Sequence, residues 1–84
     1  MSGALRFVYI IRGRKDPSRF YTGVTAEVNA RIAAHNAGRS PHTSRFTPWE
    51  RVVSIAFAEE RRAIAFEKYL KSGSGVAFAR RHLR

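Results

Sequence analysis

Short apolar runs and stretches that favour helix follow one another along the chain. The run Leu5–Ile11 is rich in β-branched and aromatic residues, which predicts a strand with at least one buried face. A polar cluster with turn chemistry, Gly13–Ser18, separates it from a second run, Arg19–Val24, so the two runs predict a β-hairpin. The run Arg51–Phe57 predicts a third strand.

The first predicted helix runs from about Ala26 to Ala37. Thr25 is a candidate N-cap, Glu27 lies in the first turn where the helix dipole favours an acid, and Gly38 is placed to end the helix. The segment Arg39–Trp49 contains Ser, Pro, His and Thr with basic residues, and it predicts an exposed loop that could follow a phosphate backbone.

The second predicted helix covers Glu59–Ser72, and a stripe of apolar residues at helical spacing supports it: Ala63, Phe66 and Leu70. Gly73-Ser74-Gly75 is expected to break this helix before a last short basic helix, Val76–His82. The order β-β-α-β-α-α predicts an α+β fold in which helices flank a three-stranded, mainly antiparallel sheet. Residues 1–84 are expected to form a single domain.

The composition fits a small globular domain, because 44% of the 84 residues are hydrophobic. The chain has no cysteine, so disulfides and thiolate zinc sites are excluded, and its three histidines lack zinc-ligand spacing, which leaves a zinc hydrolase poorly supported. No apolar run reaches the length of a membrane span, and Met1–Arg6 lacks the layout of a signal peptide. We therefore expect a cytoplasmic location and no membrane partner.

Positive charge dominates the chain, since 16 Lys and Arg oppose 6 Asp and Glu for a formal net charge of +10. Arginines make up 13 of these cations. The planar guanidinium binds phosphate oxygens in pairs, and neutralised phosphates release counterions, so nucleic acid is the leading candidate partner. Ribosome association, an anionic membrane surface and plain solubility are the alternatives.

Arg31 and His35 share the edge of the inward face of the first predicted helix. A cation at such an edge favours an anionic partner. The alternative is an arginine that extends to solvent beside a histidine at a helix end.

Glu67 has apolar neighbours on both sides along the second long helix, with Ile64 before it and Leu70 after it. A half-buried carboxylate requires a cation, and the candidates are a metal ion, Arg31 across the core, or Lys71 one turn later. The alternative is an intrahelical pair with Lys71 that tips toward solvent.

Tyr9 and Tyr21 lie on the two strands of the predicted hairpin, where they would be neighbours in many registers. Taken alone, two such tyrosines indicate cross-strand packing. Two phenols, an inward-edge arginine and an inward-edge glutamate on successive elements can nevertheless converge at one end of so small a sheet. We treat this convergence as the hypothesis of a site.

The same residues resemble the motifs of the GIY-YIG nuclease superfamily, in particular its short free-standing bacterial members and the nuclease domain of the excision-repair incision subunit. The resemblance extends from about Phe7 to Gly75 and is carried by four segments in order: Val8-Tyr9-Ile10, Tyr21-Thr22-Gly23, Arg31–Gly38 and Phe66–Gly75. Val8 stands where the family usually has a glycine-isoleucine start. Many relatives also place an asparagine after the glutamate, whereas here none follows Asn36, so Ser72, Ser74 or water would take that role.

The resemblance implies a Mg²⁺-dependent DNA endonuclease, with Mn²⁺ as a substitute and no small-molecule cofactor. It assigns Glu67 to the metal, Arg31 to the scissile phosphate, Tyr9 and Tyr21 to the attacking water and the phosphate, and His35 to a place beside the phosphate. Cleavage is expected to be structure-selective or nonspecific, in DNA repair or recombination. The alternative is a non-catalytic basic module that binds nucleic acid. The further residues expected to contact nucleic acid are Arg39, His42, Thr43, Arg45, Lys71 and Ser72.

Overall fold

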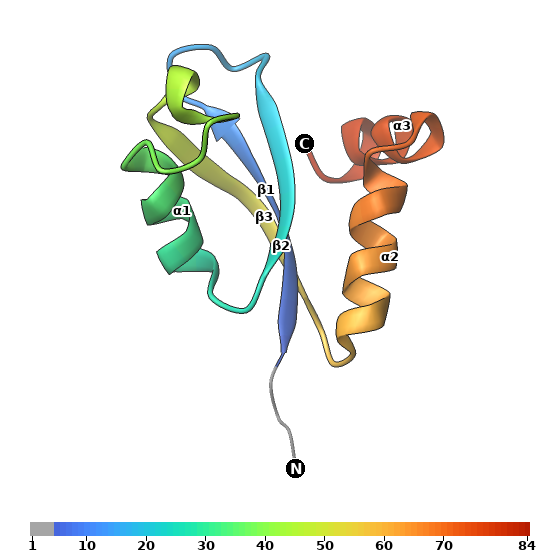
Figure 1. The fold of residues 1–84 in the computed structure, drawn as a ribbon. Coiled ribbons are helices and arrows are strands. Elements are labelled where there is room, and N and C mark those ends of the chain that lie inside the picture. Colours follow the sequence, from blue (N-terminus) through green and yellow to red (C-terminus); the bar gives the residue numbers. More distant parts are fainter. Residues whose placement is uncertain (1–4) are drawn as a thin grey trace.

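The computed structural model describes residues 5–84 and confirms the predicted order of strands and helices (Figure 1). The elements are β1 (Arg6–Gly13), β2 (Phe20–Thr25), α1 (Val28–Asn36), a 3₁₀ helix η1 (Ser44–Phe46), β3 (Trp49–Phe57), α2 (Glu60–Leu70) and α3 (Gly73–His82). The expectation drawn from Met1–Arg6 rests largely on residues 1–4, which lie outside the described part. None of the helices in residues 5–84 has the length and apolar character needed to cross a membrane.

The sheet has the strand order β2-β1-β3, and β1 pairs antiparallel with both neighbours. Helix α1 covers one face of the sheet, while α2 and α3 cover the opposite face (Figure 1). The α+β class and the antiparallel sheet are therefore confirmed. Strand β2 forms one edge of the sheet, next to the corner between α2 and α3.

The central strand β1 supplies side chains to two separate cores, because successive residues of a strand point to opposite faces. Val8 and Ile10 pack with residues of α2 and α3, whereas Tyr9 and Ile11 pack on the face that α1 covers. Each of these four side chains is at most 1% exposed. The sheet thus separates two layers of packed side chains, and β1 belongs to both.

A β-bulge interrupts the pairing of β1 with β3. Ile10 pairs with Val53 and the next residue, Ile11, pairs with Arg51, so Val52 is left as the extra residue. Such a bulge shifts the alternation of side chains along one strand. Val52 and Val53 accordingly both pack against the core beneath α2 and α3, although they are adjacent in the chain.

Helix α1 begins at Val28, two residues later than predicted, because the residues before it form a local turn. The Thr25 hydroxyl accepts a hydrogen bond from the backbone N–H of Glu27 at 3.2 Å, and Glu27, rather than Thr25, is the N-cap residue. Gly38 follows the C-cap with φ +79°, a conformation that favours glycine, so its predicted role at the helix end is confirmed.

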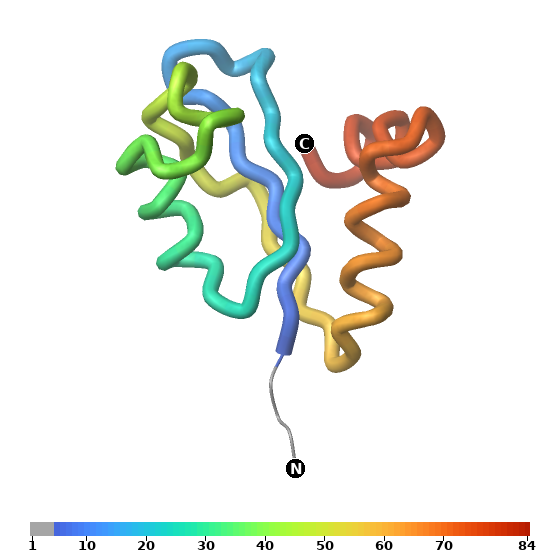
Figure 2. Tube along the Cα trace, in the orientation of Figure 1, coloured from blue at the N-terminus to red at the C-terminus, as the bar shows by residue number. Residues whose placement is uncertain are grey.

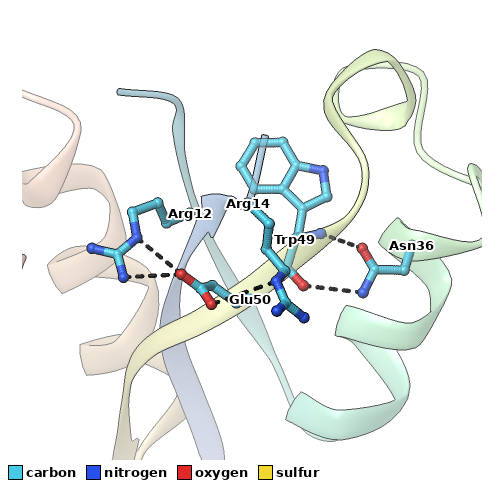
Figure 3. Close-up of polar contacts among 5 residues, drawn as sticks. All are labelled: Arg12, Arg14, Asn36, Trp49 and Glu50. Carbon is cyan, nitrogen blue, oxygen red and sulfur yellow. Dashed lines mark hydrogen bonds and ion pairs between the residues drawn. The ribbon is translucent and has the colours of Figure 1, made fainter. Parts of the chain in front are cut away.

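The end of α1 is fastened to the start of β3 by one side chain (Figure 3). The Asn36 amide accepts a hydrogen bond from the Trp49 backbone N–H at 2.6 Å and donates to the Trp49 carbonyl at 3.1 Å. Next to it, Glu50 forms ion pairs with Arg12 at 2.9 Å and Arg14 at 3.9 Å (Figure 3). Asn36 therefore has a structural role, because both its amide nitrogen and its amide oxygen are hydrogen-bonded to the Trp49 backbone.

The segment Arg39–Trp49 is not the fully exposed loop that its polar sequence predicts. It contains η1, and three of its side chains are buried: Ser40, Thr43 and Trp49. The indole N–H of Trp49 donates to the Thr43 carbonyl at 2.9 Å, which draws the loop onto the face of the sheet beneath α1.

Helix α3 begins at Gly73, so the Gly73-Ser74-Gly75 segment starts a helix instead of separating two. Ser72 is the N-cap, and its hydroxyl accepts from the Gly75 N–H at 3.2 Å. A Cβ atom at Gly75 would lie 1.6 Å from the Tyr69 carbonyl oxygen. Gly75 is therefore required by the close approach of α3 to the end of α2, which a reading of glycine as a helix breaker does not anticipate.

Candidate functional site

The phenol of Tyr9 lies across the edge strand β2. Tyr9 pairs with Gly23, and a Cβ atom at position 23 would lie 2.6 Å from the Tyr9 hydroxyl oxygen and 2.8 Å from Cζ. No side chain fits between the ring and the backbone there. Gly23 therefore lets the phenol extend over β2 toward the edge of the sheet.

Three aromatic rings meet at this edge on the α1 side of the sheet. Tyr21 pairs with Ile11, so it lies diagonally from Tyr9 on the same face, and their ring centroids are 6.3 Å apart. The His35 ring lies edge-on to Tyr21 at 4.9 Å and 5.9 Å from the Tyr9 ring. The predicted proximity of the two tyrosines is thus confirmed, and His35 joins them from α1.

A continuous chain of buried hydrogen bonds runs from Tyr9 through His35 to Thr43. The Tyr9 hydroxyl lies 2.8 Å from Nε2 of His35, and Nδ1 of His35 lies 2.7 Å from the Thr43 hydroxyl. His35 is 0% exposed, and Tyr9 and Thr43 are each 1% exposed. Both ring nitrogens therefore have a protein partner in a region closed to solvent, which fixes the orientation of the imidazole.

Burial sets the protonation states of Tyr9 and His35. Burial raises the pKa of the Tyr9 phenol, although the neighbouring Arg31 guanidinium acts in the opposite direction. Burial, followed by the positive charge of Arg31, lowers the pKa of His35. At neutral pH both the Tyr9 phenol and the His35 imidazole are thus neutral. A neutral imidazole donates a hydrogen bond at one nitrogen and accepts one at the other.

Glu67 approaches the same edge from the opposite layer. Its side chain is 15% exposed, and its Oε2 lies 2.5 Å from Nζ of Lys71, which is itself 5.8 Å from the centroid of the Tyr21 ring. The intrahelical pair with Lys71 is therefore formed, but it is held against β2 instead of tipping into solvent. Within residues 5–84, no ion pair joins Glu67 to Arg31.

Arg31 completes the group at the exposed edge of α1. Its charge acts on the pKa values of both Tyr9 and His35, and the negative charge of Glu67 also acts on the pKa of Tyr9. The structure thus brings the five predicted catalytic residues to one edge of the sheet, from β1, β2, α1 and α2.

The site offers few ligands to a metal ion. The described part of the chain holds no cluster of three or more His, Asp or Glu side chains suited to a metal. One carboxylate, with water and phosphate oxygens completing the shell, fits the way in which Mg²⁺ binds to proteins, whereas a closed protein cage is absent from these residues. Lys71 is the cation that Glu67 contacts in the structure, so a metal ion would compete with this pair.

The residues expected to contact nucleic acid separate into two groups. Those with exposed side chains are Arg39, His42, Arg45, Lys71 and Ser72. Thr43 is buried, so its predicted contact with nucleic acid is wrong for this structure: its hydroxyl is directed to His35. The hydroxyl of Ser72 is also engaged, since it donates to the Tyr69 carbonyl at 2.6 Å and caps α3.

Sequence reasoning missed the supporting residues of the site. Thr43 lies in a segment without periodicity, and nothing in its neighbourhood along the chain indicates that it turns inward. Gly23 belongs to the motif Tyr21-Thr22-Gly23, but its role becomes visible only when the register places it beneath the Tyr9 ring. Only the fold shows these two contacts.

Comparisons with known proteins identify the family and the fold of the chain. The model of the GIY-YIG catalytic domain matches residues 6–76. A UPF0213 protein of Staphylococcus haemolyticus is 43% identical over 56 residues, which are 67% of this chain and 62% of that protein. A UPF0213 protein of Lacticaseibacillus paracasei is 38% identical over 53 residues, or 62% of this chain and 60% of that protein. The matches thus span less than two thirds of each relative.

A solved structure also shares the fold. The solution NMR structure of a UPF0213 protein from Bacillus halodurans is similar with a TM-score of 0.52 at 27% sequence identity. The similarity covers 88% of this chain and 80% of that one. The fold, the order of the motifs and the sequence relatives therefore point to the same group of proteins.

Proposed function

This chain belongs to the GIY-YIG catalytic domain family, whose domains are nucleases that act on DNA, and on that premise we propose that it is a Mg²⁺-dependent DNA endonuclease. Mn²⁺ is expected to substitute for Mg²⁺. The observation that carries the proposal is the convergence at Tyr9: its buried hydroxyl contacts a neutral His35, while the charges of Arg31 and Glu67 both act on it.

Each residue has a chemical task in phosphodiester hydrolysis. Glu67 would hold the metal ion, which when bound stabilises negative charge on the phosphate and on the leaving oxygen. Arg31, exposed at the rim, contacts the nonbridging oxygens and stabilises the charge that grows in the transition state. Tyr21 flanks the phosphate and restricts its position at the β2 edge.

Tyr9 and His35 together handle the proton of the attacking water. A phenol whose pKa is raised is a poor base by itself, and its contact with neutral His35 gives its own proton a place to go, at Nε2. Tyr9 is closed to solvent in the structure, so the attacking water must first reach its hydroxyl at the β2 edge. The hydroxyl then accepts the water proton as its own proton passes to Nε2 of His35. The water oxygen bonds to phosphorus, the bond to the leaving sugar oxygen breaks, and that oxygen takes up a proton from solvent. His35, whose pKa is lowered, gives the relayed proton back through Tyr9 to solvent, which restores the neutral pair.

The remaining positive charge serves to bind the DNA backbone. The exposed cations of the loop after α1, Arg39 and Arg45, would contact phosphates away from the cleaved bond. Such contacts carry no sequence information, so we propose structure-selective or nonspecific cleavage. A role in DNA repair or recombination is part of the same proposal.

Nicking of supercoiled plasmid with Mg²⁺, Mn²⁺ or EDTA tests the proposal. We expect Glu67→Gln and Arg31→Ala each to lower the cleavage rate by about 100-fold or more while the protein stays folded, because each removes a charge used in the transition state. Glu60→Gln is the matched control for Glu67: it removes an exposed carboxylate of the same helix, and cleavage should persist.

Two results would contradict the proposal. Unchanged cleavage by both Glu67→Gln and Arg31→Ala would show that the proposed site does not catalyse cleavage. Tight DNA binding by the wild-type protein, with no cleavage in either metal ion, would favour the alternative of a non-catalytic nucleic-acid-binding module.

A further inference from the structure

A cavity of about 620 Å³ lies between the edge strand β2 and the corner formed by α2 and α3. We propose that this cavity binds the nucleotide next to the cleaved bond, with its base separated from the base stack. The inference rests on the proposed nuclease function and adds to it a substrate requirement: one nucleotide beside the scissile phosphate must be unpaired.

The cavity walls have the chemistry of a base-binding pocket. Its volume lies in the range of ligand pockets in proteins, about 300–1,000 Å³. Phe20, Leu70 and Val76 supply aromatic and aliphatic surface from three different elements. Nucleobases stack on aromatic rings, and on guanidinium planes, without requiring a particular sequence.

Three cationic or imidazole side chains surround this apolar surface: His42, Lys71 and Arg84. The Arg84 guanidinium lies 4.2 Å from the centroid of the Phe20 ring, and the Arg84 backbone N–H donates to the Ala79 carbonyl at 2.9 Å. Figure 2 shows the chain after α3 returning to lie beside β2. The guanidinium thus covers one face of the Phe20 ring, and its own outer face can stack on a base or contact a phosphate.

The cavity is continuous with the candidate catalytic site through two shared residues. Tyr21 and Lys71 line the cavity, and the same two side chains lie beside His35 and Glu67, respectively. A phosphate at the site and a base in the cavity can therefore belong to one nucleotide or to adjacent ones. A base inside a duplex is paired and stacked, so it cannot enter a cavity behind the edge strand unless it leaves the helix.

An abasic scan of the substrate tests the inference directly. The reference substrate is a labelled DNA duplex with one unpaired nucleotide. Its cleavage rate is compared with the rates for a series of duplexes, each of which lacks the base at one position around the cut. We expect one flanking position to be sensitive, with cleavage reduced about 10-fold or more by loss of its base, in line with the contribution of a single stacking contact. A fully paired duplex of the same sequence should be cut more slowly.

Protein variants connect the sensitive position to the cavity. Val76→Phe fills the cavity and Arg84→Ala removes one of its cations, and both should abolish the difference between the intact and abasic substrates. Arg80→Ala is the matched control, because Arg80 is an exposed arginine of α3 that does not line the cavity. Circular dichroism verifies that each variant is folded.

Binding measurements separate this inference from the proposed function. Fluorescence anisotropy in EDTA reports the affinity for the unpaired and abasic DNAs without any cleavage. The inference is supported if the wild-type protein binds the abasic DNA more weakly than the intact DNA and if Val76→Phe abolishes this difference. This result would stand even if the wild-type protein cuts no DNA. Equal binding of both DNAs together with uniform sensitivity across the scan would overturn the inference while leaving the nuclease intact.

Discussion

The hydroxyl of Tyr9 lies 2.8 Å from Nε2 of His35, and both side chains are closed to solvent. The contact joins the central strand to α1 and places a neutral acid next to a neutral base. It is at once a tertiary contact and the proposed route of a proton. Changes at this pair are therefore expected to affect both the stability of the fold and cleavage.

The stability of the protein should depend on pH through His35. Its pKa is lowered in the folded state, whereas the pKa of an unfolded histidine is about 6.5. The stabilising effect of a neutral His35 is thus fully present above about pH 6.5 and is lost as the pH falls through the folded pKa. Urea denaturation from pH 7.5 down to about 5 should show a falling free energy of unfolding.

A pair of histidine variants identifies the source of that slope. His35→Gln should flatten the pH dependence over this range even if it lowers stability at every pH. His82→Gln, which replaces an exposed histidine of α3, should leave the slope unchanged. An unaltered slope in His35→Gln would show that another group titrates.

Thr43 should act as a positioning residue for His35. Thr43→Val keeps the shape of the side chain but leaves Nδ1 of the buried imidazole without a partner, which costs about 1–3 kcal/mol of stability. Cleavage should fall and its pH profile should shift, whereas Thr43→Ser, which retains the hydroxyl, should restore both. If Thr43→Val only lowers the melting temperature and leaves the pH profile unchanged, Thr43 has a structural role alone.

Gly23→Ala should displace the Tyr9 phenol. The added Cβ would lie 2.6 Å from the hydroxyl oxygen, so the ring must move, at a cost of about 1–3 kcal/mol in stability and with a strong loss of cleavage. Gly73→Ala is the control, because a Cβ there has no atom within 4 Å. Similar cleavage by the two alanine variants would show that the position of Tyr9 is unimportant.

Lys71 should compete with a metal ion for Glu67. Calorimetric titration of Mn²⁺ is expected to show tighter binding to Lys71→Gln than to the wild type, because the cation at 2.5 Å from Oε2 is removed. Glu67→Gln should abolish binding at this site. Weaker Mn²⁺ binding by Lys71→Gln would mean that the lysine supports the metal site instead of competing with it.

DNA affinity should fall steeply with salt concentration, given the net charge of +10. Each phosphate contact contributes a slope of about −0.9 to a plot of log affinity against log salt concentration for duplex DNA. Arg39→Ala and Arg45→Ala should each make the slope less negative by about 0.9, the contribution of one phosphate contact. A slope near zero would indicate that phosphate contacts do not dominate binding.

The pattern of apolar residues predicted the strands, the order of elements and the inward stripe of α2, because each follows from a period of two or of 3.6 residues. Glu67 was found in the same way, as a carboxylate among apolar neighbours. Its pairing with Lys71 was among the alternatives, but the orientation of that pair against β2 depends on how α2 packs on the sheet.

Contacts between neighbouring elements, which depend on how those elements pack, account for what the sequence did not predict. Thr43 turns inward because the Trp49 indole and the His35 ring both bind it, and neither partner is visible from the neighbours of Thr43 in the chain. Gly75 lies inside α3 because the Tyr69 carbonyl leaves no room for a side chain. Glycine serves equally well as a helix breaker and as a site of close approach, and only the packing decides between these roles.

Because a single sheet divides the interior, the proposed cleavage requires that both sides of the sheet are fully folded. Tyr9 and His35 lie on the side of the sheet that α1 covers, whereas Glu67 lies on α2, which covers the opposite side. If either layer loosens, Glu67 loses its position relative to the other proposed catalytic residues, which lie on the α1 side. A partly denatured molecule could keep its positive charge and hold DNA, yet it would be unable to cut it.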